Sequence, residues 1–278
     1  FFDTVSHSKL IEVLSRTIKD GRVISLIHKY LRSGVMVNGL FVRSEEGTPQ
    51  GGPLSPLLSN VMLNELDKEL ERRGLPFIRY ADDSMIFCRS KRAAGRVRES
   101  ITNFIEGRLH LKVNKEKTVV SYGRGVKYLG YSFYINKGKC LLTVHPKTKA
   151  KMRRRLKELT GRSNGMGYAK RKKELRLYIK GWVNYYHLAT MKRLTEETDE
   201  WLRRRLRMCI WKSWKLPKTR IKNLIKCGIN KYNARQWGYV KGYWRVAGTP
   251  IMHMTASNVN LRKAGYTFLY DEYVKWLP

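Results

Sequence analysis

Two adjacent aspartates, Asp82 and Asp83, are the residues of this sequence best suited to chemistry. They stand in "FIRYADDSMIF", between two runs of strand-forming residues. Adjacent carboxylates repel each other, and a purely structural hairpin turn would ordinarily use Asn-Gly or Asp-Gly. A divalent cation is the usual partner of two neighbouring carboxylates. The pattern therefore predicts a metal-binding hairpin, with an acidic turn exposed to solvent as the alternative.

Paired carboxylates of this kind support phosphoryl transfer. Two divalent ions about 3.5–4 Å apart can activate an attacking 3′-hydroxyl and stabilise a leaving pyrophosphate in an in-line displacement. In a hairpin, the first aspartate can point at a metal while the distorted turn lets the second lie beside it.

The elements that must position this pair follow from hydrophobic periodicity and turn residues. Residues 7–34 predict two short helices broken at Asp20-Gly21, and Asn38-Gly39 predicts a hairpin. A Gly/Pro loop then leads into an amphipathic helix that ends at Gly74. After the aspartate hairpin we expect a helix over residues 91–109 and short strands within 110–122, 126–135 and 139–144.

From about Pro146 the pattern becomes helical and basic. Two basic amphipathic helices are separated by "GRSNGMG", and a third is expected after Thr195, with the acids of "EETDE" in its first turn. We interpret an apolar stripe on that third helix as core; it consists of Leu202, Leu206, Ile210 and Trp214. The predicted fold class is α+β: helices on an antiparallel sheet, followed by an all-α domain.

The charge balance indicates a polyanionic partner. The 278 residues include 57 Lys and Arg against 22 Asp and Glu, a net charge of +35. Residues 1–150 carry 26 basic and 14 acidic side chains, whereas residues 151–278 carry 31 and 8. Basic runs taken singly are often solvated helix faces, but their repetition favours nucleic-acid binding. The candidate contacts are Arg153, Arg154, Arg155, Lys170, Arg171, Lys172, Lys173, Arg203, Arg204 and Arg205.

Other classes of protein are disfavoured by the same composition. The four cysteines are widely spaced without a C-x-x-C pair, which argues against a zinc site or a disulfide framework. No run of about 18 apolar residues is present, so we expect no membrane partner. No signal peptide is recognisable, and we expect a reducing, intracellular location.

The aspartate hairpin belongs to an ordered set of motifs. "YADD" is preceded by "GTPQGGPLSPLLSN" and followed by "LKVNKEKT" and "KYLGYSF". This series resembles that of reverse transcriptases of the group II intron-encoded maturase type. The helical half, with "LRLYIKGWVNYYHLA" and "GYWRVAGTPIMH", resembles the maturase or X domain that serves these proteins as a thumb. The resemblance implies a right-hand polymerase palm over residues 1–145, a thumb/maturase domain over 146–229, and a basic, aromatic extension over 230–278 that could bind DNA.

The resemblance also implies roles for single residues. Asp82 and Asp83 would be catalytic ligands of two Mg²⁺ ions, and Lys117 a possible general acid near the pyrophosphate, although an ordinary surface lysine is equally possible. Tyr128, Leu129 and Gly130 would form the primer grip, with Gly130 making the turn and Leu129 equally well placed in a sheet core. The substrate-binding residues would be Phe2, Pro49, Gln50, Gly51 and Tyr80, with Gln50 contacting the nucleotide and Gly51 allowing close backbone approach.

A third catalytic aspartate is implied about five residues before Phe2, which lies before residue 1 of the sequence. Asp3 is a weaker candidate for that ligand, because it matches a later, more structural aspartate of the motif. Without a third carboxylate, two-metal binding would be weaker by several kcal/mol, on the order of one lost charge contact. The N-terminal fingers of the family would be missing as well.

These features leave more than one function open. The leading prediction is an RNA-directed DNA polymerase that also binds group II intron RNA, with an RNA template, a DNA primer and a DNA target as partners. We expect it in the bacterial cytoplasm, associated with the nucleoid. The alternative is a catalytically inactive, RNA-binding splicing cofactor whose aromatics stack on bases, although core packing suits most of them better. A polymerase that makes RNA is disfavoured, because Phe2 would crowd a ribose 2′-hydroxyl.

Overall fold

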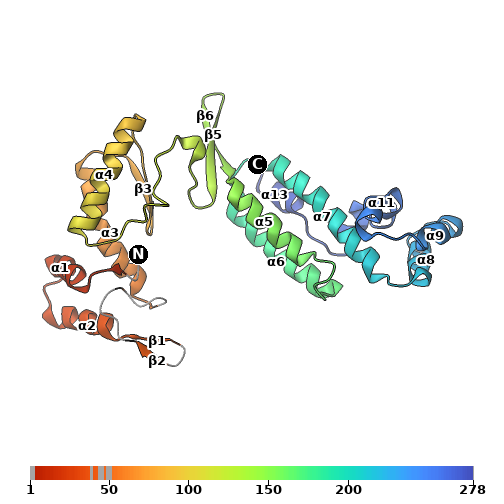
Figure 1. Ribbon diagram of the computed structural model, residues 1–278, viewed down its shortest axis with the longest axis horizontal. Coiled ribbons are helices and arrows are strands. Elements are labelled where there is room, and N and C mark those ends of the chain that lie inside the picture. The colour runs from red at the N-terminus through yellow and green to blue at the C-terminus, as the bar shows by residue number, and fades with distance from the viewer. Residues whose placement is uncertain (1–3, 38–39, 43–46, 48–51, 278) are drawn as a thin grey trace. The chain divides into compact units, whose positions relative to one another are not determined.

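The computed structural model describes residues 4–37, 40–42, 47 and 52–277, and it divides into two compact units. The first unit comprises Phe1–Tyr122 and the second Gly123–Pro278 (Figure 1). The sequence places the palm boundary near residue 145, whereas the contacts group residues 123–145 with the second unit. The three-domain division itself stays a prediction.

Four α-helices build the described part of the first unit, and all four were predicted. Three of them have a side-chain cap at the N-terminus: Ser6 accepts from the Lys9 amide, Asp20 from Arg22 and Ser90 from Ala93. The core between them contains Leu10, Leu31, Met62, Leu66 and Leu70, of which none is more than 3% exposed. The helices are α1 (His7–Thr17), α2 (Gly21–Arg32), α3 (Ser55–Arg72) and α4 (Lys91–Arg108).

The described strands of the first unit form two separate two-stranded hairpins. The strands are β1 (Val35–Val37), β2 (Leu40–Val42), β3 (Phe77–Tyr80) and β4 (Asp83–Ile86). Both hairpins were predicted, but not their separation, because we expected one antiparallel sheet with helices layered on it. The strand expected within residues 110–122 is absent from the described structure, where an Asn114-capped turn and loops occupy this segment.

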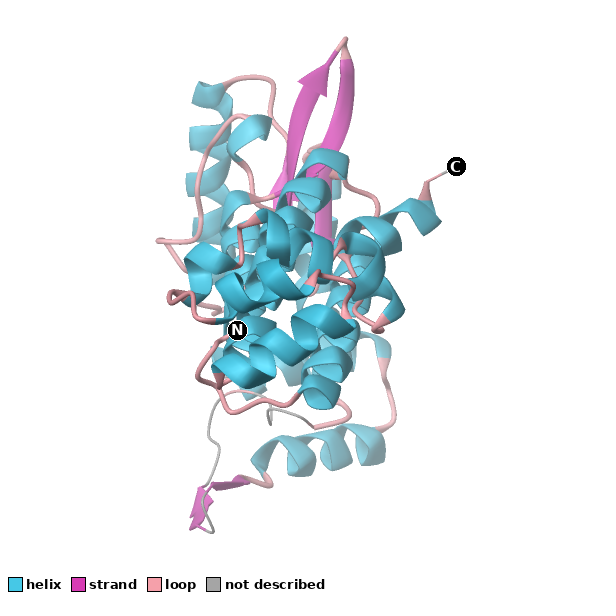
Figure 2. Ribbon diagram, turned by 90° about the vertical axis from the view of Figure 1, so that its right-hand side faces the viewer, coloured by secondary structure: helices cyan, strands magenta, loops and turns pink. Residues whose placement is uncertain are grey.

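The second unit is mainly helical, with one long antiparallel hairpin (Figure 2). That hairpin joins β5 (Tyr131–Asn136) to β6 (Lys139–Val144), close to the expected strands. The longer helices are α5 (Pro146–Leu159), α6 (Tyr168–Tyr186), α7 (Lys192–Ser213) and α8 (Pro217–Lys226). Shorter helices follow: α9 (Lys231–Gly238), α10 (Tyr243–Val246), α11 (Pro250–Thr255), α12 (Asn258–Lys263) and α13 (Leu269–Tyr273).

A continuous apolar core joins α5, α6 and α7. The stripe predicted on α7 is confirmed as core: Leu202 and Leu206 are fully buried, and Ile210 and Trp214 pack against them. The predicted start of α7 was wrong, because the helix begins at Lys192 rather than after Thr195 and its first turn holds no acid. Asp199 instead accepts hydrogen bonds from the amides of Leu269 and Tyr270, at the N-terminus of α13.

The predicted α+β class is therefore confirmed at the level of helices combined with small antiparallel sheets. Within the described residues, no helix is both long and apolar enough to cross a membrane.

Candidate active site and nucleic-acid interface

The aspartate pair lies at the tip of the β3–β4 hairpin. Tyr80 pairs with Asp83, so Ala81 and Asp82 form a two-residue turn. Both residues are exposed, which is compatible with a metal-binding hairpin and with the alternative of an acidic turn exposed to solvent. Tyr80 is also exposed, next to them at the end of β3.

The turn is held in an unusual conformation. Ala81 has φ +53°, a left-handed value that costs a residue with a Cβ atom about 1–2 kcal/mol. Arg79 stabilises this turn, since its Nη1 donates to the Ala81 carbonyl at 2.9 Å. The same guanidinium makes a bidentate pair with Asp67 of α3, with Nη2 2.5 Å from Oδ2 and Nε 2.8 Å from Oδ1. A planar guanidinium suits such a fork. Arg79 therefore ties the aspartate turn to α3.

The donor set at the hairpin tip is compatible with Mg²⁺. Carboxylate oxygens are hard ligands, and proteins commonly bind this ion through one or two carboxylates together with substrate phosphates. The described residues contain no group of three or more His, Cys, Asp or Glu side chains that could hold a metal ion. Asp82 and Asp83 thus fit a metal that the substrate helps to hold.

Other predicted residues of this site are not brought to it by any described contact. Lys117 is exposed in the turn capped by Asn114, and no hydrogen bond or ion pair joins it to Asp82 or Asp83 within the described structure. Phe2 lies outside the described residues. So do three further predicted substrate-binding residues: Pro49, Gln50 and Gly51.

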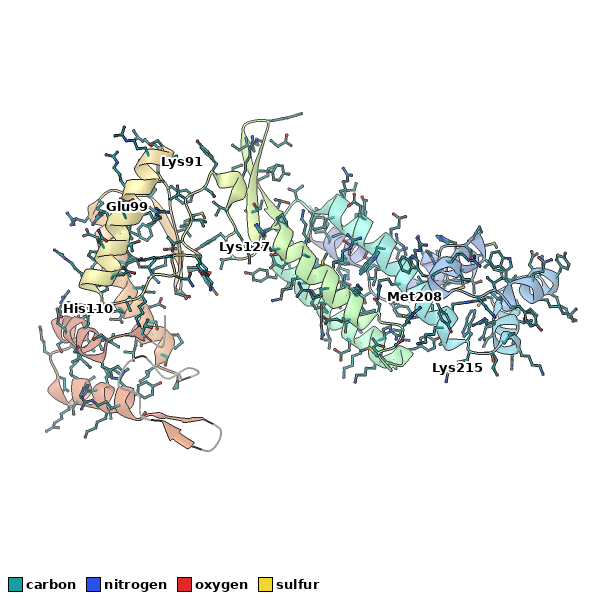
Figure 3. All side chains as sticks on the ribbon, in the orientation of Figure 1. Lys91, Glu99, His110, Lys127, Met208 and Lys215 are labelled. Atoms are coloured by element: carbon teal, nitrogen blue, oxygen red, sulfur yellow. The ribbon has the colours of Figure 1, made fainter. Side chains whose placement is uncertain are left out.

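The predicted primer grip is a tight turn in the second unit, directly after Lys127, which is labelled in Figure 3. Tyr128 and Tyr131 exchange two backbone hydrogen bonds, of 3.1 and 2.9 Å. Between them, Leu129 has φ +50° and Gly130 φ +84°, the pair of positive values that a type I′ turn requires. Gly130 makes the turn, as predicted, and Leu129 is half-buried.

Side chains of α5 and α6 hold this turn in place by hydrogen bonds. Tyr185 donates to the Leu129 carbonyl at 3.2 Å, and Thr148 Oγ1 donates to the Gly130 carbonyl at 3.0 Å. The Tyr131 hydroxyl donates to the Tyr185 carbonyl, and burial raises the pKa of Tyr131 to about 12. A Cβ atom on Gly130 would overlap the Tyr186 hydroxyl. No local signal in the sequence places Tyr185 or Tyr186 against this turn.

Some of the predicted nucleic-acid contacts are exposed, and others are held by partners within the chain. The exposed ones are Arg153, Arg154, Arg155, Lys170 and Lys173. The engaged ones have partners within the chain: Arg171 is buried and donates to the Leu159 carbonyl, Lys172 donates to the Ala264 carbonyl, and Arg205 donates to Thr160 and two carbonyls. Arg203 and Arg204 lie over the rings of Phe268 and Trp244. A direct RNA contact by these residues stays a prediction.

Comparisons with known proteins give a family match in each half of the chain. Residues 1–133 match the family model described as "Reverse transcriptase (RNA-dependent DNA polymerase)". Residues 149–228 match the model described as "Group II intron, maturase-specific domain". The chain belongs to the group II intron reverse transcriptase/maturase family. The resemblance found in the motif series is confirmed.

Individual relatives agree with this assignment. The chain is 32% identical to Protein YkfC of Escherichia coli strain K12 over 166 residues, which cover 47% of this chain and 44% of YkfC. It is 26% identical to the group II intron-encoded protein LtrA of Lactococcus lactis subsp. cremoris over 201 residues, covering 49% of this chain and 34% of LtrA. It is 29% identical to the putative COX1/OXI3 intron 2 protein of Saccharomyces cerevisiae over 189 residues, covering 47% and 22%. The matches thus span less than half the length of these relatives.

Proposed function

We propose that this group II intron reverse transcriptase/maturase supplies the catalytic hairpin of an RNA-directed DNA polymerase. The observation that carries the proposal is the pair of exposed carboxylates, Asp82 and Asp83, on a left-handed turn that Arg79 ties to α3. A turn braced in this way presents two carboxylates from a fixed backbone, and among the described residues no Lys or Arg forms an ion pair with either of them. The family of the chain, whose activity is RNA-directed DNA synthesis, agrees with this use.

In this proposal Asp82 and Asp83 hold Mg²⁺ at the hairpin tip. When bound, the ions would activate the primer 3′-hydroxyl and stabilise the charge that develops on the pyrophosphate. The chain itself fixes the two carboxylates and, through Arg79, keeps the Ala81 turn from relaxing. Rigid placement matters because catalytic groups lose efficiency steeply when misplaced by about 1 Å.

Other residues have proposed roles in binding the substrates of the reaction at this hairpin. Gln50, flanked by Pro49 and Gly51, would contact the incoming deoxynucleotide together with Tyr80, and Phe2 would exclude a ribose 2′-hydroxyl. Lys117 would protonate the leaving pyrophosphate. The turn of Tyr128, Leu129 and Gly130 would position the primer end, a task for which its anchoring by Tyr185 and Thr148 is suited.

The second unit would bind group II intron RNA through its basic helices. The proposed partners are that RNA, an RNA template with a DNA primer, and a DNA target. The exposed cations on α5 and α6 support this, because surface arginines and lysines release counterions when they neutralise phosphates. We propose the bacterial cytoplasm, at the nucleoid, as the place of action.

Primer extension on an RNA template with Mg²⁺ and deoxynucleotides tests the polymerase. It is run on this chain and on the chain preceded by a reverse transcriptase segment that carries the aspartate expected before Phe2. We expect synthesis from the extended chain and a loss above a hundredfold in its Asp82→Asn form, because even outer-shell partners of a metal are worth about 10–100-fold. Synthesis by the unextended chain would show that the third carboxylate is dispensable. If neither chain synthesises DNA, the proposed polymerase activity is refuted.

A second candidate function is RNA binding in splicing without DNA synthesis. It is favoured by the concentration of positive charge in residues 151–278, which carry 31 basic and only 8 acidic side chains. Folded RNA is recognised largely by shape and phosphate contacts, for which such a surface is sufficient. Tight binding of intron RNA by a chain whose extended form makes no DNA would establish this reading.

A further inference from the structure

A cleft in the second unit combines cations with indole rings. It has a volume of about 530 Å³ and is lined by residues of α5, α7 and α10: Arg153, Arg154, Lys157, Trp201, Arg205 and Trp244. No carboxylate is among these described lining residues. We call it the basic–indole cleft.

Two arginines of the cleft are held in place by neutral partners. Arg205 Nε donates to Thr160 Oγ1 at 2.6 Å, and its Nη2 donates to the carbonyls of Lys157 and Thr160, both at 3.0 Å. The guanidiniums of Arg153 and Arg205 each lie 5.1 Å from the ring centroid of Trp201. Carbonyls and indole faces orient a cation without cancelling its charge. The cleft therefore presents ordered, uncompensated positive charge.

The remaining cations of the cleft also have no acidic partner. No ion pair joins Arg154 or Lys157 to a carboxylate within the described structure, whereas Arg155, on the other side of α5, pairs with Glu158 at 3.0 Å. An anion that enters the cleft would meet these charges without displacing a competing carboxylate.

Trp244 gives the cleft an aromatic surface open to solvent. Trp244 is 40% exposed, whereas Trp211 of the same unit is fully buried. The Arg204 guanidinium covers part of the indole at 4.3 Å from its centroid, and Gly248 leaves room for that arginine, because a Cβ atom there would meet Nη2 at 3.0 Å. The exposed area of Trp244 thus lies away from Arg204.

We infer that the basic–indole cleft binds one unpaired nucleotide of an RNA strand, with its phosphate at Arg153, Arg154 and Lys157 and its base stacked on Trp244. This rests on the proposed function, which makes RNA the partner of the second unit. An inorganic anion would leave the indole unused, and a base inside a duplex has no free face to stack. Base stacking on an aromatic side chain together with a cationic track is the usual way in which proteins hold single-stranded nucleic acid.

The test is binding of a short single-stranded RNA that carries 2-aminopurine, whose fluorescence falls on stacking, with a duplex of the same length for comparison. Trp244→Leu is expected to weaken single-strand binding roughly tenfold and to abolish the fluorescence change, leaving duplex binding unaltered. Trp244→Phe, which keeps an aromatic face, should retain most of both. Trp244 is not among the residues of the apolar core clusters or those packed against them, so neither change removes core packing.

A charge-matched pair of variants tests the phosphate half of the site. Arg153→Gln with Lys157→Gln should lower the salt slope of single-strand binding by about 0.7 per lost contact. Lys222→Gln with Lys226→Gln, exposed on α8 and outside the cleft, should lower it less.

Each of four results would overturn the inference. The first is that Trp244→Leu binds single-stranded RNA as tightly as the wild type, and the second is that the two double variants lower the salt slope equally. The third is that Trp244→Leu weakens binding of duplex and single strand equally, and the fourth is that the matching single-stranded DNA binds more tightly than the RNA in a Trp244-dependent way. A failure of the proposed polymerase is distinguishable from these, because it would show in primer extension while Trp244-dependent RNA binding persisted.

Discussion

At the scale of single residues, Arg79 links stability to the candidate active site. Its guanidinium joins Asp67 of α3 to the Ala81 carbonyl of the catalytic turn. The side chains of Arg79 and Asp67 are only 14% and 18% exposed, so the charges are poorly hydrated. Removing one of them leaves the other without its partner, which costs more than the net worth of the pair.

Arg79→Gln is therefore expected to lower the free energy of unfolding by about 2 kcal/mol. Denaturant unfolding measures this, with Arg16→Gln as control, because Arg16 makes exposed ion pairs that are worth less than about 1 kcal/mol. Asp67→Asn with Arg79→Gln should cost less than the sum of the single changes. In the extended chain, Arg79→Gln should also slow primer extension. Strictly additive losses would contradict the pairing.

Asp199 gives the second unit a pH dependence. Its carboxylate is 1% exposed and accepts two backbone hydrogen bonds at the start of α13. Burial raises the pKa of Asp199 to about 6, against the opposing effect of the two amide donors. The folded chain thus keeps this proton up to about pH 6, whereas an unfolded aspartate releases it near pH 4. More protons bound in the folded state means that stability falls as pH rises through this window.

The contribution of Asp199 to stability is expected to decrease by up to about 3 kcal/mol between pH 4 and pH 6. Urea unfolding of wild type and Asp199→Asn at several pH values isolates it, because the asparagine does not titrate and other groups affect both proteins alike. A difference between the two proteins that does not change with pH would show that the carboxylate is hydrated in the folded state.

At the scale of elements, the grip turn depends on α6. Gly130 has φ +84°, and an added Cβ atom would overlap the Tyr186 hydroxyl. Gly130→Ala should destabilise the chain by about 2–4 kcal/mol, of which about 1–2 kcal/mol is left-handed strain. Gly138 is a matched control, since its φ is +76° and nothing lies within 4 Å of a Cβ atom there.

Gly138→Ala should therefore show the strain alone, measured as the change in unfolding free energy. Tyr186→Phe removes the hydroxyl and should reduce the extra cost of Gly130→Ala, although ring atoms 3.1 and 3.2 Å from the Cβ position would keep part of it. Equal costs at Gly130 and Gly138 would mean that α6 does not confine the turn.

The elements also show what a sequence reveals and what it conceals. Local signals were sufficient for the helices of the first unit and for the β3–β4 hairpin, because caps, periodicity and turn residues act over a few positions. The start of α7 was misjudged, since Asp199 bonds to Leu269 and Tyr270 some 70 residues away rather than to its own helix. The motif series located Asp82 and Asp83, but nothing local pairs Arg79 with Asp67 or places Tyr185 against the grip turn. Long-range partners of this kind require the tertiary structure.

At the scale of the whole molecule, charge is divided unequally between the two units. Residues 1–122 carry 20 basic and 14 acidic side chains, a net charge of +6, and residues 123–278 carry 37 and 8, a net charge of +29. Several buried guanidiniums of the second unit, including Arg171, Arg207 and Arg220, bond to backbone carbonyls. They serve the fold, so the exposed cations must supply the binding of a polyanion.

RNA binding by the chain should therefore be steeply salt-dependent and governed by the second unit. If about 6–10 phosphates are neutralised, affinity for a structured RNA should fall by about 10³–10⁵ between 50 and 200 mM salt. Lys170→Gln with Lys173→Gln, on exposed positions of α6, should reduce the slope of log affinity against log salt by up to about 2. Lys91→Gln with Arg96→Gln removes the same charge from exposed positions of α4 and should change the slope far less. Equal changes would mean that net charge alone, and not the surface of the second unit, attracts the RNA, since distant charges act only within a Debye length of about 8–10 Å.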